Sequence, residues 1–220
     1  VNTSPGLATG SYTTTPPATV EPAAGLCTGA VITVTVDGVA RPINTALNLG
    51  VDVHNVVYTV TSAGGTETEN VAVTVVDNEA PNVTNCPAGA LVFTLGPGAC
   101  EYIFDLVLVA TDNVGFPGGA TTQSSEIHET LAPGTYSFPV TFSDAATPPN
   151  TATCTVNVTI NPFPTPITSL ICNDLVNVSL DETCNLVLNA DQILEGGPYH
   201  CYDDYLVEID RTLPLGNGPW

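Results

Sequence analysis

The stretch TATCTVNVTI, residues 151–160, alternates Ala, Cys, Val or Ile with Thr or Asn at every position. Strict alternation of this kind is typical of a β-strand with one face buried. The stretch NVAVTVVD, residues 70–77, has a similar pattern, and 19 Gly and 19 Pro supply turns between such segments. Two packed antiparallel sheets would bury the inward side chains of each strand. The sequence therefore predicts an all-β protein built from β-sandwiches.

The charge balance is strongly acidic. The chain has 22 Asp and Glu against two cations, Arg41 and Arg211, and a net charge of −20. Such a charge repels phosphate, which excludes nucleic acid as a natural partner and argues against anionic membrane surfaces. No apolar run approaches the roughly 18 residues that a membrane-spanning helix needs, so we expect no membrane insertion. An apolar content of 43% is nevertheless sufficient for a folded core.

The seven cysteines indicate the compartment. They form no CxxC pair and no cluster with histidine at metal-ligand spacing, so a disulfide framework is favoured over a zinc site. Disulfides persist in oxidising surroundings. We therefore expect a secreted protein, extracellular or at the cell surface.

Internal repeats divide the chain. ETLAPGTYSF (129–138) is similar to RTLPLGNGPW (211–220) and, more loosely, to TALNLGVDVH (45–54). The spacing of roughly 80 residues suits a seven-stranded immunoglobulin-like sandwich. We predict an N-terminal segment (1–11), a short unit (12–77), a complete unit (78–161) and a truncated unit (162–220). By its register with the complete unit, the truncated one lacks its last two strands.

The complete unit carries a family resemblance. DNEAPNVTNCPAGALVFTLGPGACEYIFDLVLVATDNVG (77–115), continued by LAPGTYSFPVTFSD and the cysteine-bearing last strand, resembles the hyalin repeat (HYR) over about residues 77–160. Val114 stands where the family usually has a third cysteine, and SDAATPPNTATC exceeds the usual turn. Residues 171–209 look like modules of very large secreted adhesins from gliding, type IX-secreting bacteria. The resemblance implies cell adhesion or matrix assembly without catalysis.

The resemblance also implies disulfide pairings. In this module the first and last cysteines lie at the start of two parallel strands, which pairs Cys86 with Cys154. The second and third positions of the last unit pair Cys184 with Cys201. Cys100 and Cys172 then remain for a bridge between units. Cys27 is left over, either for an intermolecular bond or as a buried thiol.

Acidic and amide residues gather between the units and in loops. Hard oxygen ligands at such places suit Ca²⁺, which takes six to eight oxygens, whereas the alternative is a solvated turn. The candidate ligands are Asp77, Asn78, Glu79, Asp112, Asn113 and Asp144.

We expect no enzyme, because no Ser/His/Asp arrangement or phosphate loop occurs and the three histidines are scattered. The first hypothesis is an extracellular structural or adhesive repeat protein that forms filaments with its own copies. LATGSY (7–12) resembles LAPGTY of the complete unit, so the N-terminal strand of one copy would complete the truncated unit of the next by head-to-tail β-strand addition. The assembly residues are Leu7, Gly10 and Tyr12 on the donor and Gly216 and Trp220 on the acceptor.

Three alternatives stay open. The chain could be one length of a continuous covalent repeat array rather than a filament subunit. It could be a module of a giant cell-surface adhesin that binds glycans or a cell-surface protein. It could also be a noncatalytic accessory domain of a secreted hydrolase.

Overall fold

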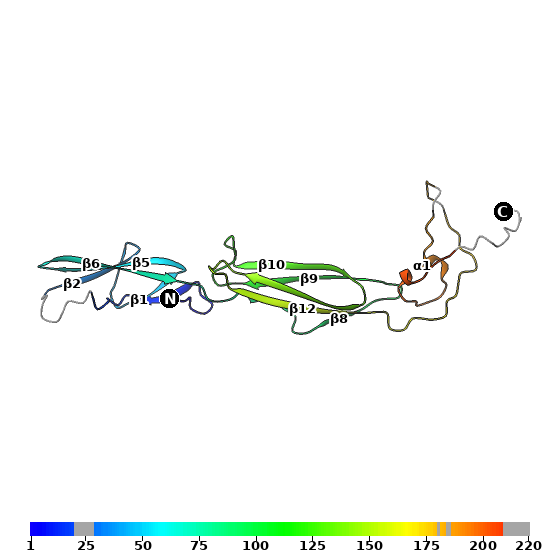
Figure 1. The fold of residues 1–220 in the computed structure, drawn as a ribbon, viewed down its shortest axis with the longest axis horizontal. Helices are drawn as coiled ribbons and strands as arrows, with labels where there is room; N and C mark the ends of the chain where they lie inside the picture. Colours follow the sequence, from blue (N-terminus) through cyan, green and yellow to red (C-terminus); the bar gives the residue numbers. More distant parts are fainter. Residues whose placement is uncertain (20–28, 180, 184–185, 209–220) are drawn as a thin grey trace. The chain divides into compact units, whose positions relative to one another are not determined.

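The computed structural model describes residues 1–19, 29–179, 181–183 and 186–208. The chain is an all-β protein, as the alternating sequence predicted (Figure 1). It divides into two compact units. Unit 1 comprises Val1–Cys86, Leu108–Ser125 and Val140–Cys154, and unit 2 comprises Pro87–Val107, Glu126–Pro139 and Thr155–Trp220. The domain boundaries proposed from the repeats stay predictions.

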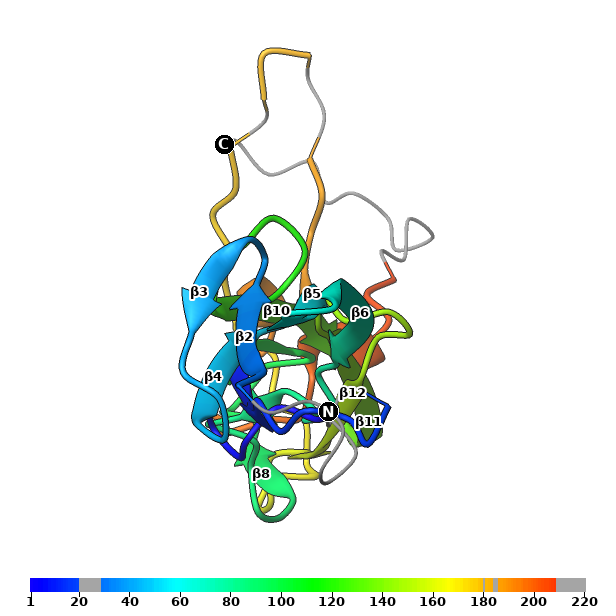
Figure 2. The same cartoon turned by 90° about the vertical axis from the view of Figure 1, so that its left-hand side faces the viewer.

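The first sheet of unit 1 is antiparallel. Its strands are, in spatial order, β3 (Val39–Arg41), β2 (Val31–Val36), β5 (Asp52–Ser62) and β6 (Gly65–Val75). The turn between β2 and β3 (Figure 2) has two residues of positive φ, Asp37 at 51° and Gly38 at 78°. A two-residue hairpin turn of this kind favours Asp-Gly, because Asp tolerates and Gly readily adopts the left-handed conformation.

A second, two-stranded sheet joins the N-terminal segment to the same unit. β1 (Thr9–Thr13) pairs antiparallel with β4 (Ala46–Gly50). Nearer the N-terminus, Asn2 forms a parallel bridge with Val76, and the Val1 ammonium donates to the Thr74 carbonyl at 2.8 Å. The segment expected to serve a neighbouring copy is therefore paired within its own chain.

The core of these two sheets is aliphatic around one tyrosine. Its buried members are Val34, Val36, Leu49, Val56, Tyr58, Val73 and Val75. The Tyr58 hydroxyl donates to the Thr15 carbonyl at 3.1 Å and lies 3.2 Å from the Tyr12 hydroxyl, so the one polar atom of this side chain is satisfied. Burial, aided by the Tyr12 hydrogen bond, raises the pKa of Tyr58 well above its usual value.

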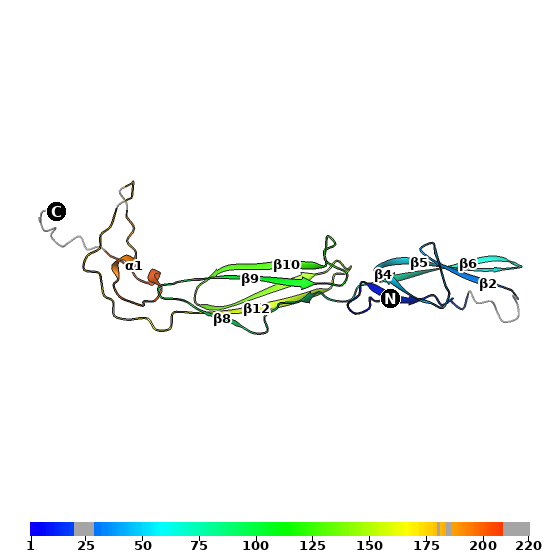
Figure 3. The same ribbon diagram turned by 180° about the vertical axis from the view of Figure 1, so that it is seen from behind.

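The remaining strands form two three-stranded sheets (Figure 3). One has the order β10 (Thr122–Leu131), β9 (Tyr102–Thr111) and β7 (Asn82–Val83), and the other β11 (Gly134–Ser143), β12 (Thr151–Asn161) and β8 (Leu91–Thr94). β12 runs parallel to β8. Cys154, Val156, Val158 and Ile160 of β12 are at most 2% exposed, which confirms the face selected by the alternating sequence. Each buried aliphatic side chain contributes about 1.5–3 kcal/mol.

The described residues between 162 and 208 contain little regular structure. They form the short helix α1 (Ala190–Ile193), the 3₁₀ turn η1 (Tyr202–Asp204) and an isolated bridge between Cys172 and Leu194. The strands expected of a truncated sandwich are not formed among these described residues. Gly216 and Trp220, the expected acceptor residues, lie outside the described part of the chain.

Gly10 offers a test of how firmly β1 is built into unit 1. A Cβ at this position would lie 2.7 Å from the Asn2 carbonyl oxygen and 2.8 Å from Val1 Cγ1, whereas a Cβ at Gly50 meets nothing within 4 Å. We expect Gly10→Ala to destabilise the protein by about 1–3 kcal/mol through overpacking. Gly50→Ala, on the strand paired with β1, is the matched control and should leave the melting temperature nearly unchanged. Equal melting temperatures for both variants would contradict this packing.

Candidate functional site

Three carboxylates of unit 1 come together at the ends of strands. Asp77 follows β6, Asp112 follows β9 and Asp144 follows β11. One oxygen of each lies within 4.8 Å of the others, and the three residues are only 8%, 9% and 2% exposed. Three of the six residues proposed as calcium ligands are thus neighbours although they are far apart in the sequence.

Backbone amides orient these carboxylates. Oδ2 of Asp112 accepts hydrogen bonds from the Val114 and Gly115 amides at 2.9 and 2.7 Å. Oδ1 of Asp144 accepts from the Ala146 and Asn150 amides at 3.0 and 2.8 Å. The loops after the strands therefore fix the orientation of these two carboxyl groups through backbone hydrogen bonds.

Asn150 connects two members of the cluster. Its Nδ2 donates to Asp144 Oδ2 at 2.7 Å and to the Asp77 backbone carbonyl at 3.3 Å. Asp77 itself accepts the Glu79 amide on Oδ1 at 3.2 Å. Oδ2 of Asp77 and Oδ1 of Asp112 are buried and accept no hydrogen bond from the described residues. One oxygen on each of these two aspartates is thus left for another ligand.

The other three proposed ligands contact the N-terminal segment. Glu79 Oε2 accepts the Gly6 amide at 2.7 Å. Asn113 Nδ2 donates to the Leu7 carbonyl at 3.0 Å, and Asn78 Oδ1 accepts Thr3 Oγ1 at 3.5 Å. These residues therefore hold the N-terminus beside the carboxylate cluster.

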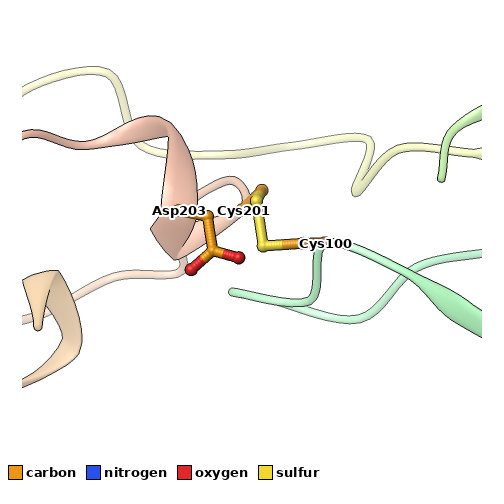
Figure 4. Close-up of side chains that lie close together, drawn as sticks. All are labelled: Cys100, Cys201 and Asp203. Atoms are coloured by element: carbon orange, nitrogen blue, oxygen red, sulfur yellow. A yellow bond between two sulfur atoms is a disulfide. The ribbon is translucent and has the colours of Figure 1, made fainter.

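A second group of metal-type side chains lies in unit 2. Cys100, Cys201 and Asp203 are neighbours (Figure 4), but the two sulfurs are joined in a disulfide. A disulfide sulfur offers no thiolate, which is the form of cysteine that binds metals. This group is therefore a covalent tie and not a metal centre.

The Cys100–Cys201 bond corrects two expected pairings. Cys201 was expected to pair with Cys184, and Cys100 with Cys172. Gly98 N donates to the Tyr199 carbonyl at 3.1 Å and Tyr202 N to the Gly98 carbonyl at 3.3 Å, which aligns the two chain segments at the cysteines. The expectation rested on residues 162–220 repeating the sandwich of the preceding unit, whereas the described residues of this segment form no such strands.

The other five cysteines fall into three groups. Cys86 pairs with Cys154, as the resemblance implied, across a sequence separation of 68 residues. Cys172 is exposed and forms no disulfide with a described residue. Cys27 and Cys184 lie outside the described residues.

A surface hollow of about 550 Å³ adjoins the Cys100–Cys201 bond. Tyr202 and Tyr205 line it together with Asn189, Asp191 and Asp203. Gly98 is required beneath Tyr202, because a Cβ there would lie 2.1 Å from ring atom Cε2. Burial, with Asp191 nearby, raises the pKa of Tyr202. The sequence showed these tyrosines only as a local cluster, and the tertiary fold combines them with α1.

Comparison with known proteins assigns no family to the chain. No family model matches the chain, and no curated protein or solved structure matches it. The hyalin-repeat resemblance accordingly stays a prediction. The two disulfides indicate an oxidising environment. Neither helix among the described residues is long and apolar enough to cross a membrane.

His54 gives unit 1 a pH-dependent contact. Nδ1 lies 2.7 Å from Asp37 Oδ2 and Nε2 lies 2.9 Å from the Gly50 carbonyl. Both partners are acceptors, so the doubly protonated ring satisfies both contacts. The Asp37 hydrogen bond, followed by that to Gly50, raises the pKa of His54.

A raised folded-state pKa stabilises the protein below the ordinary histidine pKa, and this stability is lost as the pH rises through the raised value. We expect the melting-temperature advantage of the wild type over His54→Gln to be full below about pH 6.5, the ordinary histidine pKa, and to shrink as the pH rises above it. His128→Gln is the comparison: the Asp105 hydrogen bond also raises the pKa of His128, but the two side chains are exposed by 66% and 57%, so solvent screens the pair and we expect a smaller change with pH. Equal pH profiles for the two variants would count against the His54 contact.

The Cys100–Cys201 bond can be tested directly. The tie spans a sequence separation of 101 residues, and loss of such a cross-link costs about 4–5 kcal/mol in the chain-entropy account. We expect Cys100→Ser with Cys201→Ser to make residues 162–208 sensitive to limited proteolysis, with cleavage sites read by mass spectrometry. Cys172→Ser should have no effect. Peptide mapping that links Cys184 to Cys201 in the wild type would refute the assignment.

Proposed function

We propose that the protein is an extracellular structural and adhesive repeat protein, non-enzymatic, that assembles with further copies of itself. Its support is an all-β scaffold, two disulfides and a charge of −20 that disfavours nucleic acid and anionic membranes. The observation that carries the proposal is a set of large aliphatic side chains that lie exposed between residues 167 and 206, called the apolar surface below, in a segment tied to the rest of unit 2 through the Cys100–Cys201 bond.

This apolar surface consists of large aliphatic side chains in a segment with little regular structure. Leu175, Val187 and Leu206 are 77%, 78% and 83% exposed. Smaller exposures are found at Leu170, Ile171 and Val178. Side chains this apolar and this exposed favour burial against a partner. Strands from a second copy would bury these side chains and supply backbone partners for the segment.

The N-terminal segment remains our candidate donor, with a condition that the sequence did not reveal. β1 pairs with β4 of its own chain, so donation to a neighbour requires β1 to leave that sheet. Leu7 lies just before β1 and is 55% exposed, so its side chain is accessible without any rearrangement. Deletion of the segment would damage unit 1, and point variants are therefore the better test.

We expect the full-length protein to form head-to-tail polymers, seen by sedimentation velocity and electron microscopy. Leu206→Asp should abolish them, because a charge on the apolar surface opposes its burial. Ile103→Asp is the matched control, since Ile103 is 63% exposed on β9 outside this surface. Leu7→Asp should also abolish the polymers if the N-terminal segment is the donated strand, and should leave them unchanged if assembly uses another segment. Polymers that persist in Leu206→Asp would contradict the proposal.

Glycan binding is the second candidate, favoured by the hollow next to the Cys100–Cys201 bond. Tyr202 and Tyr205 offer aromatic faces for stacking against sugar rings, and Asn189, Asp191 and Asp203 offer hydrogen-bonding groups. A monomeric full-length chain that binds a glycan array, and loses this binding on Tyr205→Ala, would support the adhesin-module function instead of assembly.

A further inference from the structure

We propose that Asp77, Asp112 and Asp144 bind one divalent cation, Ca²⁺, and that this cation fixes the N-terminal segment, residues 1–7, to unit 1. The site lies within a single chain and does not require the assembly proposed above, but a cation that holds residues 1–7 would oppose donation of this segment to a neighbour. Its carboxylate oxygens lie within 4.8 Å of one another. A cation placed among them would be within reach of all three residues.

The unpartnered oxygens point to a ligand. Asp77 and Asp112 are 8% and 9% exposed, and Asp77 Oδ2 and Asp112 Oδ1 have no hydrogen-bond partner among the described residues. Buried carboxylate oxygens are costly to leave without compensation. The other oxygen of each aspartate is already held by backbone amides, which leaves the free one for a metal.

The charge of the cluster also points to a bound cation. Three ionised carboxylates at this separation repel one another, more strongly in the interior than in water. Within the described residues the only Lys or Arg is Arg41 of β3, which is exposed and acts on Asp37. No basic side chain of the described part is thus available to neutralise the cluster, whereas a divalent cation would do so.

Ligand chemistry selects a hard metal and favours calcium. All candidate donors are oxygens, which Ca²⁺ and Mg²⁺ prefer over the nitrogen and sulfur ligands of zinc. Asn113 Oδ1 is also buried without a partner among the described residues, and Asn113 and Asp112 line a hollow of about 290 Å³ together with Gly6 and Glu79. Ca²⁺ accepts an irregular shell of six to eight oxygens, whereas Mg²⁺ demands a near-ideal octahedron. Donors from three separate loops fit the irregular shell better.

The same residues join the cation site to the N-terminus. Thr3 Oγ1 donates to Asp77 Oδ1 at 3.3 Å, and Thr3 is itself buried. Glu79 and Asn113, close to the cluster members in sequence, bond to Gly6 and Leu7 at 2.7 and 3.0 Å. Repulsion among the carboxylates without a cation would loosen these loops, and with them the contacts to residues 3–7. Calcium therefore controls how firmly the N-terminus is held.

The first test is titration calorimetry of the chelator-treated full-length protein with CaCl₂. We expect saturable one-to-one binding that an equal concentration of MgCl₂ does not prevent. Asp112→Asn and Asp144→Asn should each weaken it at least about tenfold, since each removes one charged ligand. Asp105→Asn, which changes an exposed aspartate of β9, is the matched control. The absence of binding, or full binding by both cluster variants, would overturn the site.

The second test follows hydrogen exchange in the wild type alone, so it does not depend on the folding of a variant. Addition of CaCl₂ should slow exchange of the amides of Thr3 and Gly6, while the β5–β6 amides stay unchanged. MgCl₂ at the same concentration should have a much smaller effect. Calcium binding without slower exchange in residues 1–7 would overturn the link to the N-terminus. Both measurements are made on monomeric protein, checked by sedimentation velocity, so failure here is distinct from failure of the assembly proposal.

Discussion

Burial of one face of each alternating strand is the constraint on which the other features depend. β6, β9 and β11 each have an apolar inward set, and pairing holds each strand in the register that buries it. The position of a strand's end is fixed by the same register. Asp77, Asp112 and Asp144 come directly after these three strands or one residue later, so the core also determines where the carboxylates lie.

The acidic net charge of the chain limits how the three carboxylates can be neutralised. A chain of net charge −20 has few ways to neutralise carboxylates internally, and it relies on backbone amides to hold Asp112 and Asp144. Amides stabilise a single carboxylate well, but they do not cancel the repulsion among three. A bound calcium ion would meet that need. The acidic composition thus leaves the carboxylate cluster without cationic side chains, and the proposed calcium ion would supply the missing positive charge.

The two disulfides perform different physical tasks. The Cys86–Cys154 bond joins the segment before β8 to strand β12. β12 is the parallel neighbour of β8 and is already aligned with it by hydrogen bonds. Cys100–Cys201 instead restrains a segment with little regular structure and many exposed aliphatic side chains. The second bond therefore presents an apolar surface, whereas the first reinforces a finished core. This contrast is why we place assembly or ligand binding in unit 2 and cation binding in unit 1.

The amino-acid sequence by itself determined the fold class and the buried face of β12, because alternation in residues 151–160 is a local pattern. The hyalin-repeat resemblance added the Cys86–Cys154 pairing, and the acidic turn residues marked the candidate ligands, because turn chemistry is also local. The sequence could not show the long-range contacts in the same way. These are the pairing of β1 with β4, the Cys100–Cys201 bond and the meeting of three of the six candidate ligands in one site. Only the tertiary structure decided these, because each depends on which segments are neighbours in space, and a pattern along the chain does not specify such neighbours.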